Sequence, residues 1–203
     1  MPQPRFQRRK EDRPAEITAA AMQTFSEKGY DATRVEEVAK KAGVSKGLLY
    51  LYFNTKEELF KAVVRNFVTP HLDSLVDITE SSDLSAAEFI RGPFLEFAKT
   101  VPKSPARKLI RLMIAEGPKH PDLIEWYWNN VVSRGIGTLR TVIDKGVADG
   151  EFRPSALQDF PHLLVSPILF STVFTQLFRP HAELDTDRFL EAHIELVLNS
   201  IEA

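Results

Sequence analysis

The sequence predicts an all-α protein of about nine helices, with an N-terminal unit of three helices and a larger helical C-terminal part. Two observations support this prediction. Apolar residues recur at steps of three and four along most of the 203 residues, as in helices that bury one face. Ser or Thr also stands three positions before Glu or Gln at several expected helix starts, which is the pattern of a capping box: Thr33, Thr55, Ser85 and Ser155.

The first helix is expected over residues 13–28. Ile17, Ala21 and Phe25 repeat every four residues and give this helix one apolar face. Gly29 follows, and glycine commonly ends a helix. We therefore expect this helix to be a core element that supports the two helices after it.

Two short helices joined by a tight turn are expected next. The first begins at the Thr33 capping box and ends at Gly43, a residue type that tolerates positive φ. Ser45 is placed to cap the second helix, and Leu49 is placed to lock it onto the first. This is the helix-turn-helix pattern, in which the second helix enters a DNA major groove. A plain helical hairpin is the alternative, but it does not explain why exposed tyrosines and a lysine share the second helix.

The stretch GVSKGLLYLYFNTKEELF, residues 43–60, resembles the signature of the TetR family of one-component transcriptional regulators. The similarity extends back through ITAAAMQTFSEKGYDATRVEEVAKKA, so it covers about residues 13–65. It implies an all-α homodimer, with an N-terminal DNA-binding domain and a C-terminal domain that binds a small ligand and forms the dimer. Leu48 and Leu51 depart from the commonest form of the signature, so the operator sequence is not predicted.

The expected partner of the helix-turn-helix is double-stranded operator DNA. Lys56 lies in the first turn of the next helix, expected over residues 55–70, where free N–H groups favour phosphate, and the resemblance implies that it contacts the DNA backbone. Pro70 is expected to end or kink that helix. The expected DNA-binding residues are Thr33, Arg34, Ser45, Lys46, Gly47, Leu48, Tyr50, Tyr52 and Lys56. Residues 1–56 then form the DNA-binding domain, and residues 57–203 form the ligand-binding and dimerisation domain, with helix 55–70 as the link.

Charge is distributed unevenly between these two parts. Residues 1–56 hold 11 Lys and Arg against 7 Asp and Glu, whereas the remaining 147 residues hold 15 against 21. The excess of positive charge favours salt-dependent phosphate contact by the N-terminal part, although an imbalance of this size is also found on ordinary solvated surfaces. The first twelve residues are expected to form a flexible basic arm, which either reaches DNA or acts only as a solubilising tail: Arg5, Arg8, Arg9 and Lys10.

The C-terminal part shows no strand pattern and is expected to contain five helices. Their approximate ranges are residues 85–101, 104–116, 121–149, 155–178 and 186–201. The fourth is apolar on nearly every side from Phe160 to Phe178, so it must be buried on all sides, and a second copy of the chain would cover it. We expect both last helices to form a four-helix dimer interface with their symmetry mates. Its residues are Leu169, Val173, Phe174, Leu177, Phe189, His193, Ile194, Val197 and Ile201.

Gly and Pro inside several of these helices predict kinks that leave room for a ligand. Gly92, Pro93 and Pro167 are the clearest examples. Aromatic and Met side chains are the candidates to line such a pocket, while an ordinary core is the alternative for any one of them: Phe94, Phe97, Met113, Trp126, Tyr127, Trp128, Phe170 and Phe174. A small hydrophobic or aromatic effector follows as the expected ligand.

No catalytic, metal or cofactor site is predicted. The chain has no cysteine, and its five histidines are widely spaced without a metal-binding motif: His71, His120, His162, His181 and His193. No apolar run approaches the length of a membrane span, so a cytoplasmic protein without a membrane partner is expected. The preferred function is a repressor released from its operator by the effector. A small all-α enzyme and an architectural DNA-binding protein without an effector remain the alternatives.

Overall fold

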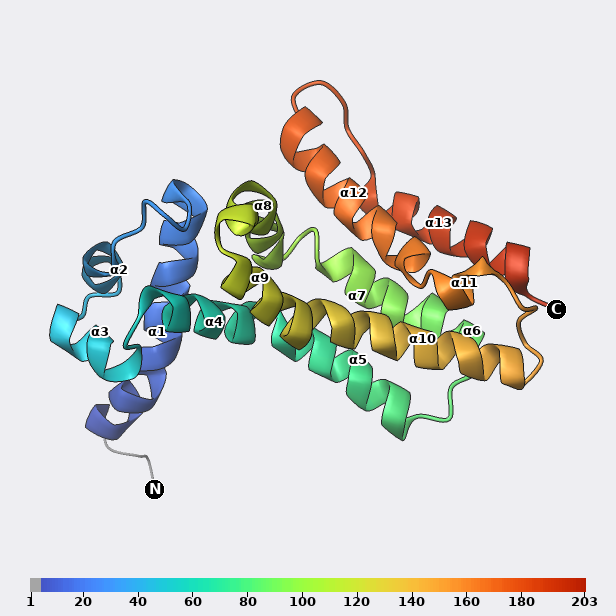
Figure 1. The fold of residues 1–203 in the computed structure, drawn as a ribbon, viewed down its shortest axis with the longest axis horizontal. Coiled ribbons are helices and arrows are strands. Elements are labelled where there is room, and N and C mark those ends of the chain that lie inside the picture. Colours follow the sequence, from blue (N-terminus) through green and yellow to red (C-terminus); the bar gives the residue numbers. More distant parts are fainter. Residues whose placement is uncertain (1–4) are drawn as a thin grey trace.

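Three helices form one end of the molecule (Figure 1): α1 (Arg5–Lys28), α2 (Val35–Lys41) and α3 (Lys46–Tyr52). The computed structural model describes residues 5–203, with side chains from Arg13 onward. The all-α prediction is confirmed, since the only β-bridge in the described residues is an isolated one between Phe152 and Glu202. The first helix begins at Arg5 instead of residue 13, so part of the expected arm is helical. Residues 1–4 and the side chains of the arm lie outside the described residues.

Helix α4 (Lys56–Phe67) leads from this end into the rest of the chain. The predicted cap is present, because the Thr55 hydroxyl accepts a hydrogen bond from the Glu58 N–H at 3.0 Å. The carboxylate of Glu58 accepts from the Asn54 N–H at 2.8 Å, so the reciprocal bond is made one residue earlier than in a capping box. Four side chains of α4 are fully buried in one core with α1, α2 and α3: Leu59, Phe60, Val63 and Val64.

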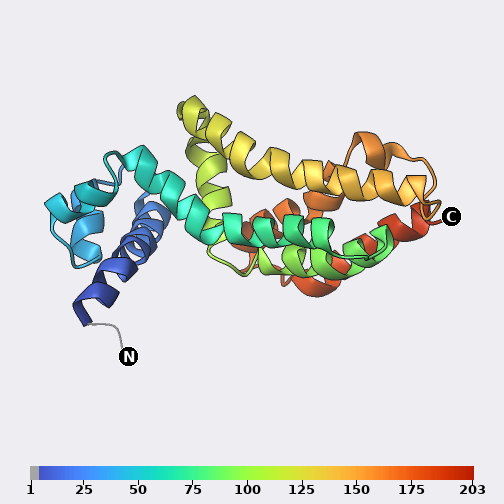
Figure 2. The same ribbon diagram turned by 90° about the horizontal axis from the view of Figure 1, so that it is seen from below.

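In the C-terminal part, α5 and α10 run alongside each other and α8 crosses their direction (Figures 1 and 2). Its helices are α5 (Thr69–Ser81), α6 (Ala86–Phe89), α7 (Leu95–Thr100), α8 (Ala106–Glu116), α9 (Pro121–Tyr127), α10 (Ser133–Ala148), α11 (Ala156–Asp159), α12 (His162–Phe178) and α13 (Thr186–Ile201). A π-helical turn, Ile90–Phe94, joins α6 to α7 without a break, and another, Trp128–Val132, joins α9 to α10. Each joined pair is one continuous helix, which gives eleven helices in the described residues instead of about nine.

One helix, α5, is absent from the sequence prediction. Pro70 was expected to end or kink the preceding helix, but α4 already stops at Phe67, and Pro70 stands in the first turn of α5. Proline is well tolerated there because the first-turn N–H groups have no partner within the helix. Leu72 and Leu75 are buried at a helical spacing, which was the signal for this helix.

Two hydrophobic cores are present, and α8 and α9 connect them. The N-terminal core is built mainly by α1–α4 but also contains Leu109 and Leu112 of α8 and Leu123 of α9. Both ribbon views place α8 and α9 beside α4 (Figures 1 and 2). The second core is formed by α5–α7 and α10–α13. None of the helices described has both the length and the apolar character that a bilayer crossing requires.

Candidate functional site

The turn between α2 and α3 has the geometry that the sequence predicts. Gly43 adopts φ +67°, a conformation that costs glycine nothing. The Ser45 hydroxyl accepts a hydrogen bond from the Leu48 N–H at 3.1 Å and thereby caps α3. Leu49 is fully buried in the N-terminal core. Helices α2 and α3 therefore form a helix-turn-helix, and the face of α3 opposite Leu49 is exposed.

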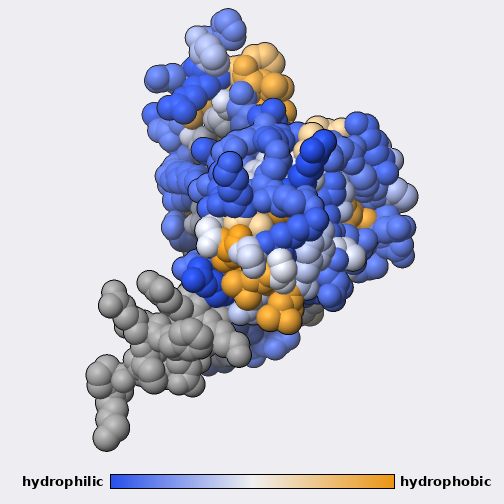
Figure 3. All heavy atoms as spheres, turned by 90° about the vertical axis from the view of Figure 1, so that its left-hand side faces the viewer, coloured by the Kyte–Doolittle hydropathy of each residue, from blue (hydrophilic) through white to orange (hydrophobic). Residues whose placement is uncertain are grey.

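The exposed face of α3 is centred on Gly47 and Leu51. At about 100° per residue, both lie roughly opposite the buried Leu49. Leu51 is 74% exposed, and an added Cβ at Gly47 would meet nothing within 4 Å. Figure 3 shows hydrophobic side chains over α3 on this otherwise mostly hydrophilic end of the molecule. Leu51 is not among the predicted DNA-binding residues. Its departure from the commonest form of the family signature could have indicated that it lies on the DNA-facing side.

The remaining predicted residues of α3 surround this face to different degrees. Tyr50 is 37% exposed, and the Lys46 ammonium lies 5.8 Å from its ring centroid. Leu48 is half-buried. Tyr52 is also half-buried, and its ring lies 6.4 Å from that of Phe53, so it packs partly against the domain core.

Lys46 is held in an exposed ion pair with α2. Its ammonium lies 2.5 Å from a carboxylate oxygen of Glu36. This hydrogen bond raises the pKa of Lys46 and lowers the pKa of Glu36. Arg34 is exposed at the start of α2 and is its N-cap. Both cations are thus on the outside of the helix-turn-helix, where a phosphate could compete for them.

Two predicted DNA-binding residues have other partners inside the chain. Thr33 is 3% exposed, and its hydroxyl donates to the Gly29 carbonyl oxygen at 2.6 Å, so it neither caps α2 nor lies on the surface. The Lys56 ammonium donates to the carbonyl oxygens of Tyr30, Asp31 and Thr33 at 2.9, 3.1 and 3.4 Å. Lys56 therefore fixes the loop between α1 and α2.

A cavity of about 330 Å³ lies in the C-terminal part. Four of the predicted pocket residues line it: Phe94, Phe97, Met113 and Tyr127. The π-helical turns contribute as well, since Val131 and Val132 of the turn after α9 lie in the wall. Gly92 and Pro93 lie in the other turn, Ile90–Phe94, whose Phe94 is in the wall. Helix α5, which the sequence analysis missed, also contributes to the wall, including Leu72 and Leu75.

The other predicted pocket residues lie elsewhere. Trp126 packs against the N-terminal core, with Lys61 and Arg65 over its ring at 5.6 and 5.4 Å. Trp128 is 50% exposed. Phe170 and Phe174 belong to an aromatic cluster on α12 and α13 with ring centroids 5.2–5.5 Å apart. Sequence periodicity does not distinguish a cavity wall from an outer face of the same helix.

The aromatic cluster is part of a large exposed apolar surface. The strongly exposed hydrophobic residues of α12 are Leu163, Leu169, Phe170, Leu177 and Phe178, and Leu196 is the one on α13. Val173, Phe174, Phe189 and Val197 are half-buried in the same region. The His193 ring nitrogen lies 2.9 Å from the Leu163 carbonyl oxygen and so links the two helices within the chain. Figure 3 shows an upper hydrophobic patch at the height of α12 in Figure 1.

Two residues of the predicted dimer interface face inward instead. Ile194 and Ile201 are 2% and 5% exposed and belong to the second core. The apolar residues of α13 therefore serve two purposes. Those on its inner side pack on α7 and α12, and those on its outer side remain at the surface.

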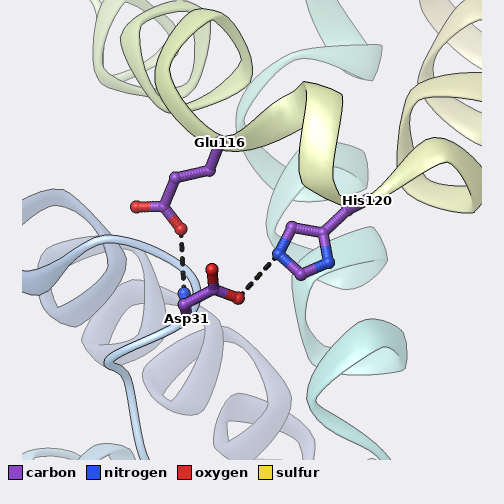
Figure 4. Close-up of side chains that lie close together, drawn as sticks. All are labelled: Asp31, Glu116 and His120. Atoms are coloured by element: carbon purple, nitrogen blue, oxygen red, sulfur yellow. Dashed lines mark hydrogen bonds and ion pairs between the residues drawn. The ribbon is translucent and has the colours of Figure 1, made fainter.

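A polar cluster joins the N-terminal unit to α8 and α9 (Figure 4). A carboxylate oxygen of Glu116 accepts from the Asp31 N–H at 2.9 Å, and the His120 ring lies 2.7 Å from the Asp31 carboxylate. Gly29 has φ +85°, which favours glycine, and an added Cβ there would lie 2.0 Å from a carboxylate oxygen of Glu116 and displace it. The sequence analysis missed this cluster, because 85 and 89 positions separate its members.

The same cluster is where a metal ion could be held. Ligand atoms of Asp31, Glu116 and His120 lie within 4.8 Å of one another. Two carboxylates and an imidazole suit a divalent cation such as zinc or manganese. Asp31 already forms hydrogen bonds with Glu116 and His120. These bonds hold α8 and α9 against the N-terminal unit without a metal ion.

A helix-turn-helix with an exposed second helix, packed against an all-α unit that contains an apolar cavity, is the arrangement expected of a one-component DNA-binding regulator. Residues 17–63 match the bacterial regulatory proteins of the tetR family, and residues 93–197 match the tetracyclin repressor-like C-terminal domain. The chain belongs to the TetR family of transcriptional regulators. Its members bind operator DNA and are not enzymes, so these two sequence predictions are confirmed.

Individual relatives cover most of the chain. The HTH-type transcriptional regulator RutR of Escherichia coli (strain K12) is 38% identical over 187 residues, which is 88% of this chain and 80% of that protein. The HTH-type transcriptional repressor KstR2 of Mycolicibacterium smegmatis is 24% identical over 187 residues, 92% of this chain and 89% of that protein. A solved TetR-family structure from Mesorhizobium loti superposes with a TM-score of 0.75 at 23% identity, covering 95% and 98% of the two chains. This structural similarity shows that the two chains share the same fold.

Proposed function

We propose that the chain is a dimeric, cytoplasmic repressor that leaves its operator when a small hydrophobic effector enters the C-terminal cavity. Residues 1–56 read the DNA, residues 57–203 bind the effector and the second subunit, and α4 connects them. One observation carries this proposal. Four residues line the cavity and also pack against the N-terminal core: Val68, Met113, Tyr127 and Val131. A ligand in the cavity thus touches side chains that support the helix-turn-helix.

The DNA-reading surface in this proposal is the outer face of α3. Gly47 lets the helix backbone approach the groove closely, and Leu51 offers an apolar contact to a thymine methyl group. Tyr50, Lys46 and Arg34 surround these two residues and supply hydrogen bonds or charge to phosphates and base edges. Lys46 must exchange its contact with Glu36 for a phosphate, which an exposed pair allows at small cost.

Dimerisation is assigned to the exposed parts of α12 and α13. Patches of apolar surface this concentrated usually mark an interface, and a second copy of the same helices provides a matching one. A two-fold dimer places its α3 helices in successive major grooves when they lie roughly 34–36 Å apart. Repression then depends on the relative tilt of the two N-terminal units.

Helix α8 is the element that can transmit ligand binding to that tilt. Its residues Ile110, Met113 and Ile114 line the cavity, and Glu116 at its end holds the Asp31 N–H of the N-terminal unit. A ligand that displaces Met113 therefore moves the same helix that contacts the α1–α2 loop. Helix α4 contributes in parallel through Val68, the residue that follows it.

The cavity supports an effector-dependent regulator over an architectural protein, which has no need to enclose one. The proposal is tested first on DNA flanking the protein's own coding region, by fluorescence anisotropy at fixed moderate salt. We expect one fragment to bind at least about a hundredfold tighter than random DNA. Leu51→Ala should lower affinity for that fragment several-fold and leave random DNA unchanged. If all fragments bind alike, sequence-specific repression through α3 is wrong.

A further inference from the structure

The polar groups of the cavity wall are few, and this restricts what can bind there. Of the 22 residues that line it, three have a polar side chain, and none of the 22 is Lys, Arg, Asp or Glu. These three are His71, Tyr127 and Thr138. With a volume of about 330 Å³, the cavity is at the lower end of the range, roughly 300–1,000 Å³, that is usual for small-molecule sites.

Of the three, only Tyr127 is half-buried and makes no hydrogen bond within the described residues. The Thr138 hydroxyl donates to the Arg134 carbonyl oxygen at 3.0 Å, and His71 is exposed at the surface. The Tyr127 hydroxyl has no hydrogen-bond partner among the described residues. Burial raises the pKa of Tyr127 to about 12, so its phenol keeps its proton at physiological pH. A donor that faces an apolar cavity without a partner is unfavourable, and such groups normally find one.

We propose that the Tyr127 hydroxyl donates a hydrogen bond to the effector, which is a neutral, largely apolar molecule with one accepting oxygen, such as a ketone, ester or lactone. This inference rests on the proposed effector function of the cavity. A carboxylate or phosphate is disfavoured, because the wall contains no Lys or Arg to compensate a buried negative charge. A purely apolar ligand is disfavoured because it leaves the phenol unpaired.

The position of Tyr127 links this contact to DNA binding. Its ring packs against the N-terminal core, and it stands at the end of α9, directly before the π-helical turn. The accepting oxygen of the ligand is therefore drawn to the end of the cavity nearest the helix-turn-helix, while the apolar body occupies the space lined by Phe94 and Phe97.

Three probes of equal chain length separate the alternatives: 2-undecanone, undecane and undecanoate. Binding of each to the full-length protein is followed by intrinsic tryptophan fluorescence, since Trp126 and Trp128 flank Tyr127. We expect the ketone to bind about tenfold tighter than the alkane and tighter than the carboxylate. Tyr127→Phe should bring the ketone to within about twofold of the alkane while leaving alkane affinity unchanged.

Thr138→Val is the matched control, because it removes a hydroxyl from the same wall that is already bonded to Arg134. The Thr138→Val variant should still bind the ketone about tenfold tighter than the alkane. If none of the probes binds, the effector function of the cavity is wrong. If they bind but wild type and Tyr127→Phe show the same preference, only the role of Tyr127 is wrong. If undecanoate binds tightest to the wild-type protein, the proposal that the ligand is neutral is wrong. This comparison does not depend on any variant.

Discussion

Lys56 is a residue whose role differs between the sequence and the structure. The family resemblance implies a phosphate contact, whereas its ammonium donates to three carbonyl oxygens of the α1–α2 loop in the structure. It also lies 4.6 Å from the Tyr30 ring centroid. Each of its three protons thus has a partner within the chain, and a phosphate would have to displace at least one of them.

This difference is testable with Lys56→Met. As a loop anchor, Lys56 should contribute about 1–3 kcal/mol to the free energy of unfolding, because hydrogen bonds from a charged donor are lost. DNA affinity should also fall, but the slope of log affinity against log salt should stay unchanged. Denaturant unfolding and anisotropy at four salt concentrations measure both quantities.

Lys46→Met is the control for this experiment. Its ammonium is exposed and, within the part of the chain that the structure describes, contacts the side chain of Glu36 and the ring of Tyr50, so it can exchange these partners for a phosphate. Its removal should make the salt slope shallower by about 0.9, the value for one lost phosphate contact, with little loss of stability. A shallower slope and unchanged stability for Lys56→Met would instead restore the phosphate contact that the resemblance implies.

At the scale of elements, Gly146 shows how closely α10 packs. An added Cβ would lie 2.4 Å from a ring carbon of Phe152 and 2.8 Å from the Cβ of Ala86. Gly146→Ala should therefore lower the free energy of unfolding by about 1–3 kcal/mol through overpacking. Gly137→Ala on the same helix meets nothing within 4 Å and should be neutral or stabilising by up to about 1 kcal/mol. Urea denaturation of both variants provides the comparison, and equal stabilities would contradict the close contact.

The exposed side of α12 predicts the oligomeric state. Phe170→Glu and Leu177→Glu replace side chains that are 53% and 63% exposed in the single chain, so each monomer should still fold. A buried, unpaired carboxylate at the dimer interface would cost several kcal/mol, about 3–5 for comparable defects. Sedimentation should then show monomers. Leu51→Glu, at the opposite end of the molecule, should remain dimeric, and an unaltered dimer in all three would place the interface elsewhere.

Local sequence patterns predicted most element boundaries because their causes are local. The caps at Ser45, Thr55 and Ser85 lie next to the N–H groups that they satisfy, and residues 186–201 form the last helix as expected. Helix α5 was missed because proline at a helix start and proline at a helix end give the same local signal. The start of α2 shifted by one residue because the Thr33 hydroxyl bonds a carbonyl in the preceding loop.

At the scale of the whole molecule, the features that were not predicted depend on long-range packing. The sequence contains no sign that Asp31, Glu116 and His120 meet, since their contact follows from how α8 docks on the N-terminal unit. Four of the seven aromatic residues expected in the pocket lie outside it for a similar reason. Composition identifies residues that avoid water, whereas the helix arrangement decides which of them border a cavity.

The docking of α8 also makes a prediction about coupling. In the proposed mechanism, effector and operator act on one equilibrium between a DNA-binding and a released arrangement, so each changes the affinity of the other by the same factor. Coupling of about 1–3 kcal/mol is typical, which is roughly 5- to 150-fold. We therefore expect operator DNA to weaken effector binding by a factor in this range, measured by titrating the effector against the protein with and without saturating operator.

Glu116→Gln tests whether this coupling passes through α8. The amide oxygen can still accept from the Asp31 N–H, but without the full negative charge, so the contact between α8 and the N-terminal unit is weakened while the cavity keeps its lining. Effector affinity without DNA should stay within about twofold of wild type, and the coupling factor should fall several-fold. If α4 alone transmits the signal, the coupling factor will be unchanged in this variant. Equal effector affinities with and without operator in the wild type would mean that the ligand does not act through this equilibrium at all.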